Sequence, residues 1–189
     1  MADNFDFDKE VLKEFQFLVE NGFAVEEVQP TIVRYASDLY RINVFYGPHT
    51  REIGIEFDDL EHSKFGACSL APLIAVFDRT FADAMPMSVP ATTRAAVQDC
   101  VGTLARDFRT HIRLDGLRSP DLLAKARTVA LEMAAARYPT ITTQRLQARF
   151  QAMWEKKQYA ELIELFEALY EHLTDDERAK FDAAKRALT

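Results

Sequence analysis

Apolar and polar residues alternate with two different periods along this chain, and the period changes near residue 66. Before that point, one stretch with helical spacing is followed by runs that alternate residue by residue. After it, apolar residues recur every three or four positions, which is the spacing of amphipathic helices. The pattern predicts an α+β protein in which an N-terminal helix packs on a small, mainly antiparallel sheet, followed by an all-helical C-terminal part of antiparallel helical hairpins. We expect two regions, 1–66 and 67–189, which either form separate modules or pack as one unit.

The N-terminal helix is predicted over Asp6–Asn21. Its apolar residues fall on one face, so we expect this face to cover the sheet. Gly22 follows the last turn, and glycine at this point accepts the left-handed conformation that closes many helices. The apolar face consists of Val11, Phe15, Leu18 and Val19.

Four runs after this helix alternate apolar and polar residues, which predicts β-strands. The first is a short edge strand that ends before Pro30, because proline cannot donate a hydrogen bond to a neighbouring strand. The next two form a hairpin around Ser37-Asp38, and the last follows a turn at Gly47-Pro48. The runs are residues 23–28, 31–36, 40–46 and 52–57, and the face expected under the helix carries Ile42, Val44, Ile53 and Ile55.

The region after residue 66 is predicted to form a series of helices joined by short turns. Ser119 precedes Pro120, and this pair favours the first turn of a helix. Thr174 and Glu177 fit the capping box that opens a final helix. The predicted helices span residues 69–77, 92–112, 119–138, 142–154, 159–173 and 174 onward.

Composition and cysteine usage limit the class of protein. The chain is 48% hydrophobic and 28% charged, which suits a folded domain. Its longest apolar runs, such as Leu73–Phe77, are far shorter than the ~20 residues of a membrane-spanning helix. The first ten residues carry four acidic groups and one lysine, the reverse of a secretory leader. Cys68 and Cys100 lack the spacing of a disulfide framework or a zinc site. We therefore expect a soluble, cytoplasmic protein without membrane contact.

The formal net charge of -7 is concentrated in the N-terminal region. Residues 1–65 hold 14 acidic and 6 basic side chains, a net charge of -8. An acidic surface disfavours nucleic acid, since binding phosphates needs a basic footprint. It favours encounters with a basic protein partner.

Motifs for catalysis, cofactors or metals are absent from the sequence. It has no nucleophile elbow, no phosphate-binding glycine loop and no pair of histidines at metal-ligand spacing. We therefore predict neither a metal nor a cofactor and favour a protein that is not an enzyme. The cluster Asp58, Asp59, Glu61 and His62 either binds a hard cation such as magnesium or calcium, or is a solvated acidic loop. Arg106, Arg109 and Arg113 share a helical face that is either solvated or in contact with acidic groups.

Two resemblances to known families rest on short motifs. The last three predicted helices resemble tetratricopeptide hairpins, because Trp154, Tyr159-Ala160, Leu165 and Ala183-Ala184 fall near the aromatic and small positions of such pairs. The chain also resembles a group of small uncharacterised bacterial α+β proteins, through Phe15–Phe23, Val33-Arg34-Tyr35, Val44-Phe45-Tyr46, Glu52–Glu56, Trp154–Tyr159, Leu173-Thr174 and Glu177. The second resemblance implies this fold and a bacterial origin. Some members of that group are suspected immunity or accessory proteins of toxin loci.

These observations lead to a hypothesis with two alternatives. The hypothesis is a non-catalytic protein-binding protein, of immunity or accessory type, that meets a basic partner with an acidic N-terminal face. The first alternative is a helical adaptor that holds a peptide in its C-terminal hairpins, and the second is an enzyme with a site near Asp58–His62. The residues predicted to contact the partner are Glu26, Glu27, Asp58, Asp59 and Glu61.

Overall fold

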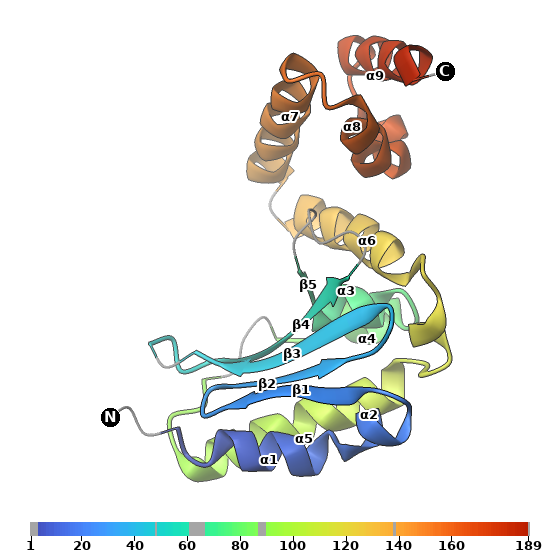
Figure 1. Ribbon diagram of the computed structural model, residues 1–189. Coiled ribbons are helices and arrows are strands. Elements are labelled where there is room, and N and C mark those ends of the chain that lie inside the picture. The colour runs from blue at the N-terminus through green and yellow to red at the C-terminus, as the bar shows by residue number, and fades with distance from the viewer. Residues whose placement is uncertain (1–3, 48, 61–66, 87–89, 138, 189) are drawn as a thin grey trace. The chain divides into compact units, whose positions relative to one another are not determined.

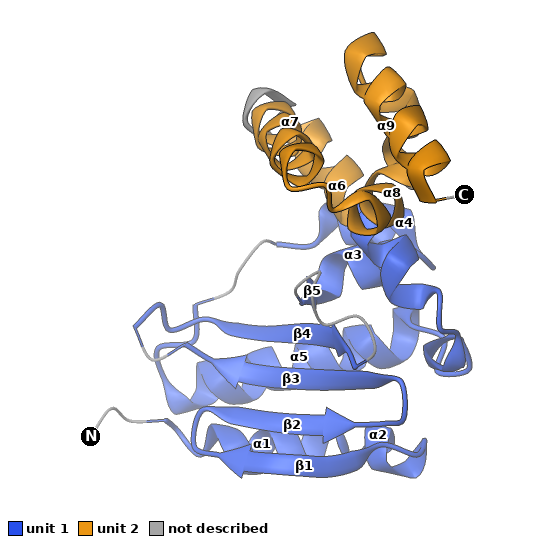
Figure 2. Ribbon diagram, turned by 45° about the horizontal axis from the view of Figure 1, so that its top comes forward, with its two compact units in different colours: residues 1–129 blue, residues 130–189 orange. Residues whose placement is uncertain are grey.

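The chain folds into two compact units, residues 1–129 and 130–189, coloured blue and orange in Figure 2. A computed structural model describes residues 4–47, 49–60, 67–86, 90–137 and 139–188. The first unit is longer than the region expected over 1–66, because helices that follow the sheet in sequence pack on it. In the described residues, no helix combines the length and the apolar character needed to cross a bilayer.

The first unit contains a five-stranded antiparallel sheet whose strands follow one another in sequence order. Together with the many helices, this confirms the predicted α+β class. The fifth strand has only two residues, too few to show alternation in the sequence. The strands are β1 (Ala24–Gln29), β2 (Ile32–Ala36), β3 (Tyr40–Tyr46), β4 (Ile53–Asp59) and β5 (Cys68–Ser69).

Helices cover one face of this sheet, and Figure 1 shows α1 and α5 running beneath it. The face they cover carries the predicted residues Ile42, Val44, Ile53 and Ile55, all of which are buried. The Tyr35 hydroxyl of β2 donates to the Val11 carbonyl of α1 at 3.3 Å, which ties helix to sheet. The helices are α1 (Phe7–Glu14), α2 (Gln16–Glu20), α3 (Leu70–Ala75), α4 (Arg79–Ala84) and α5 (Arg94–His111), followed by the 3-10 turn η2 (Gly116–Arg118).

The helix predicted over 6–21 is two helices that meet at Phe15. Phe15 and Phe17 are both buried. On one continuous helix their side chains would diverge by about 200°, so only one could face the core. The interruption lets both rings pack on α5, with centroids 6.3 and 5.5 Å from that of Phe108. Gly22 then closes α2 with φ at 94°, in the left-handed region, as predicted.

The second unit is helical and has its own core. The last turns of α6 (Leu122–Arg137) are followed by α7 (Pro139–Glu155), α8 (Tyr159–Phe166), the 3-10 segment η3 (Glu167–His172) and α9 (Asp175–Leu188). Its buried centre consists of Phe150, Leu162, Phe166, Leu169, Leu173, Phe181 and Ala184. The helix expected over 159–173 therefore changes to 3-10 geometry after Phe166.

The predicted capping box of the last helix is present. The Glu177 amide donates to Thr174 Oγ1 at 3.3 Å, and the Thr174 amide donates to Glu177 Oε2 at 2.9 Å. These two bonds satisfy amides that a helix start leaves without an intrahelical partner.

Candidate functional site

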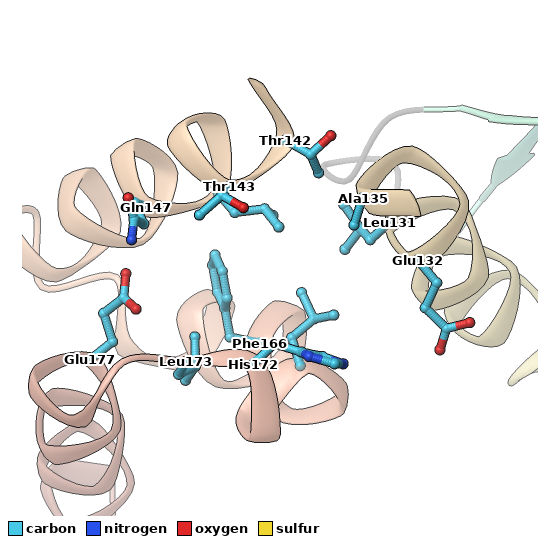
Figure 3. Close-up of a pocket in the computed structure, with 12 residues that line it drawn as sticks. Leu131, Glu132, Ala135, Thr142, Thr143, Gln147, Phe166, His172, Leu173 and Glu177 are labelled. Atoms are coloured by element: carbon cyan, nitrogen blue, oxygen red, sulfur yellow. The ribbon is translucent and has the colours of Figure 1, made fainter. Parts of the chain in front are cut away.

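An apolar pocket of about 380 Å³ lies within the second unit. Figure 3 shows it between α7 and the last turns of α6 on one side and the α8–η3–α9 segment on the other. Its apolar lining consists of Leu131, Ala135, Leu146, Phe166, Leu169 and Leu173. Its polar lining consists of Glu132, Thr142, Thr143, Gln147, His172 and Glu177.

The floor of the pocket is part of the unit's buried core. Phe166 is 1% exposed, and its ring meets that of Phe150 edge to face with centroids 5.0 Å apart. Leu169 and Leu173 follow on η3 and just after it, and both are buried. Because these side chains are fixed by packing, the pocket is formed before any ligand arrives.

The wall opposite this floor comes from the end of α6 and the start of α7. Thr142 is buried, and its hydroxyl donates to the Ala134 carbonyl at 3.0 Å. Ala134 is in the last turn of α6, where carbonyls lack an intrahelical partner. The bond therefore satisfies one of these carbonyls and fixes α7 against α6, while the small Ala135 leaves room for the pocket.

Charge in the pocket is acidic. Glu177 and Glu132 are the charged lining residues, and none of the lining side chains is Lys or Arg. Glu177 Oε2 also accepts from the Thr174 hydroxyl at 2.8 Å, so the capping box holds its carboxylate in place. Figure 3 shows Glu177 and Gln147 facing each other at one end, with His172 and Glu132 toward the other.

The lining of the pocket combines an apolar floor with polar side chains. No group of three or more His, Cys, Asp or Glu side chains that could hold a metal occurs in the part of the chain that the structure describes. In the pocket, the Thr142 hydroxyl is already bonded to backbone and Glu177 is bonded to Thr174. Thr143, Gln147 and His172 add further polar groups to the lining. The apolar floor suits a ligand with an apolar group.

Glu26 and Glu27, predicted to contact the partner, lie on β1 and are paired with arginines of β3 and β2. Glu26 lies at the bulge of β1, between Val25 and Glu27, and binds Arg41 with both oxygens, at 2.6 Å from Nε and 3.0 Å from Nη2. This hydrogen bond to Arg41 lowers the pKa of Glu26. Glu27 pairs with Arg34 of β2. Both carboxylates therefore already have a counter-charge within the sheet.

Asp58 and Asp59 end β4 instead of lying in a loop, and consecutive strand residues point to opposite faces. Asp58 is on the face away from α1 and accepts a hydrogen bond from Asn43 Nδ2 at 2.9 Å. Asp59 is buried on the helix-covered face, with its Oδ2 3.9 Å from Arg127 Nη1. The fold thus gathers Glu26, Glu27 and Asp58 on one face and separates Asp59 from them. Glu61 and His62 lie outside the described residues.

Glu56 also belongs to this face, and the sequence did not single it out. It is opposite Asn43 and lies on the same side of β4 as Asp58. Burial, and then the nearby Asp58 charge, raise the pKa of Glu56. Glu56 alternates with the buried Ile55 and Phe57, so the sequence pattern predicts an exposed side chain. Its partial burial depends on residues of the neighbouring strands, which the local sequence does not reveal.

The arginines predicted to share a helical face have mixed surroundings, and Arg113 lies beyond the end of α5 at His111. The guanidinium of Arg109 lies over the Phe17 ring, 5.4 Å from its centroid. Arg113 pairs with Asp115 at 3.0 Å. One arginine therefore contacts the N-terminal helices through an aromatic ring, and another pairs locally.

Protein-family models, curated proteins and solved structures contain no match to this chain.

Proposed function

We propose that this protein is a non-catalytic binding protein and that it holds another protein through the apolar pocket of its C-terminal helical unit. The observation that carries the proposal is a pocket of about 380 Å³ whose floor is preformed by Phe166, Leu169 and Leu173. Hydrophobic grooves of proteins commonly bind an amphipathic helix of a partner by burying its apolar side chains. An immunity or accessory role in a toxin locus is the form of this function that the family resemblance suggests.

The acidic N-terminal face is the weaker candidate for the contact surface. Glu26 and Glu27 would have to exchange Arg41 and Arg34 for groups of the partner, so a new ion pair there would replace an existing one. Exposed ion pairs contribute only about 0–1 kcal/mol, and such an exchange gains little. The surplus negative charge of this region can still attract a basic partner over a distance.

The test fills the pocket by one substitution. Ala135 lines the pocket, whereas the next residue on the same helix, Ala136, is exposed and is not part of the lining. Ala135→Leu places extra methyl groups in the pocket, and Ala136→Leu is the matched control with the same change in helix propensity. A photocrosslinking residue at Thr143, an exposed lining position, captures the partner in the native host.

Binding of the captured partner is then measured by calorimetry. Ala135→Leu should weaken the affinity at least tenfold, which corresponds to about 1.4 kcal/mol, and Ala136→Leu should leave it unchanged. Equal affinity for both variants, together with a loss in Glu26→Lys, would move the binding site to the acidic N-terminal face.

A further inference from the structure

We infer that the pocket selects a basic amphipathic segment of another protein, with an apolar side chain on the pocket floor and Lys or Arg on either side of it. The inference rests on the proposed function and names the chemistry of its partner. It follows from how charge is distributed around the floor.

The floor and the margins of the pocket differ in character. The centre is apolar and is formed by Phe166 and the leucines around it. The charged lining side chains are both carboxylates, Glu177 from α9 and Glu132 from α6, and no lysine or arginine lines the pocket within the described residues. A ligand that buries an apolar group here therefore brings its flanking atoms close to negative charge.

The two carboxylates stand toward different ends of the pocket. Figure 3 shows Glu177 beside Gln147 at one end and Glu132, from the other wall, near the opposite end. A segment that crosses the floor thus meets a carboxylate on each side of its apolar anchor. This spacing favours a basic–apolar–basic order in the ligand over a single basic group.

Glu177 is preorganised for this contact. Its Oε2 is held by the Thr174 amide and hydroxyl at 2.9 and 2.8 Å. Among the described residues, its other oxygen accepts no hydrogen bond, and it remains for a donor of the ligand. A side chain that is already fixed loses less conformational entropy when it binds. A charged donor of the ligand therefore contributes more binding free energy here than it would beside a mobile glutamate.

Each ion pair between a basic group of the ligand and Glu177 or Glu132 should change the affinity by a small factor. Ion pairs at exposed sites change an equilibrium constant by about 1.5- to 5-fold. Their effect falls as salt rises, since the screening length is ~10 Å at 0.1 M salt. The apolar anchor supplies the larger part of the affinity, and the carboxylates choose among ligands that share this anchor.

The test uses four synthetic helical peptides with a fluorescent label. Three share one leucine anchor and carry Lys, Gln or Glu on both sides of it, and the fourth has the Lys flanks but alanine at the anchor. Dissociation constants are measured by fluorescence anisotropy at low and high salt with the full-length protein. The leucine peptide with Lys flanks should bind at least about threefold tighter than its Gln counterpart at low salt, and the Glu peptide should bind weakest.

Substitutions at the pocket margin complete the design. Glu132→Gln with Glu177→Gln removes both charges, and glutamine at position 177 still completes the capping box. This double variant should bind the Lys and Gln peptides equally. Glu164→Gln, on an exposed residue of α8 outside the pocket lining, is the control and should keep the preference.

The outcomes separate the two proposals. If the Lys and Gln peptides bind equally, or the Glu peptide binds best, while Ala135→Leu weakens all of them, the basic-partner inference fails and the pocket remains the binding site. If the alanine-anchor peptide binds as tightly as the leucine peptide, unspecific attraction explains the result and the inference also fails. If Ala135→Leu has no effect on any peptide that binds, the pocket is not the site and the proposed function fails.

Discussion

Phe108 joins three elements of the first unit, and its removal is expected to destabilise that unit strongly. Its side chain is fully buried, and its ring centroid lies 6.3 Å from that of Phe15, 5.5 Å from Phe17 and 5.7 Å from Phe57. These rings come from α1–α2 and from β4, so Phe108 on α5 connects the helices to the sheet. Phe108→Ala leaves a cavity among them, and such truncations cost about 3–5 kcal/mol.

The loss of stability in Phe108→Ala should be measurable and confined to the first unit. A cost of this size lowers the midpoint of thermal unfolding by roughly 10 °C or more. Hydrogen exchange should show lost protection in α1, α5 and β4. The single tryptophan, Trp154, lies in the second unit, so its fluorescence transition should be retained. Phe108→Leu keeps part of the buried volume and should cost less, about 1–2 kcal/mol.

One result would refute this reasoning. If Phe108→Ala lowers the free energy of unfolding by less than about 1 kcal/mol, the ring does not fill a packed core and the connection between α5 and the sheet has another basis. Equal costs for the alanine and leucine variants would also contradict it, because the cavity left by leucine is smaller.

Two further changes test the sheet and the capping box. Because burial raises the pKa of Glu56 above its ordinary 4.5, the folded protein binds this proton more readily than the unfolded chain, and stability falls as pH rises through the raised value. Glu56→Gln should therefore stabilise the protein at pH 7, and this gain in stability should disappear below about pH 4.5. The control Glu20→Gln, at an exposed position, should leave the free energy of unfolding unchanged at pH 7. Urea unfolding of both variants at several pH values measures these differences. Thr174→Ala should destabilise the second unit by about 1 kcal/mol, measured as unfolding monitored by Trp154 fluorescence. Thr174→Ser keeps the capping hydroxyl and should retain most of the stability.

The fold could be predicted where local pattern decides it. Ile53, Ile55 and Phe57 alternate with polar residues, and both the strand and its buried face followed from that alternation. The capping box at Thr174 was also readable, because its donors and acceptors lie within four residues. The break at Phe15 was not, since it depends on α5, which is about 80 residues further along the chain.

The pocket could not be predicted, for a related reason. Its floor looks in the sequence like any other amphipathic helix face, and Phe166 and Leu169 are core residues and floor at once. The space above them exists because Ala135 is small and because Thr142 fixes the opposite wall. The acidic residues chosen from the sequence were selected by net charge, which does not reveal that Arg41 already accompanies Glu26.

The outer edge of β1 (Ala24–Gln29) has a consequence for how copies of this chain meet. In the described residues, β2 is the only strand beside it, so its other side offers unpaired backbone groups to a passing strand. An antiparallel copy in full register would set Val25 against Val28, but it would also set Glu26 against Glu27, and like charges directly opposite repel. The bulge also bends β1, so a strand of a second copy cannot pair with it in regular geometry along its whole length. The two glutamates and the bulge thus disfavour the edge-to-edge pairing by which sheets of separate molecules join into fibrils.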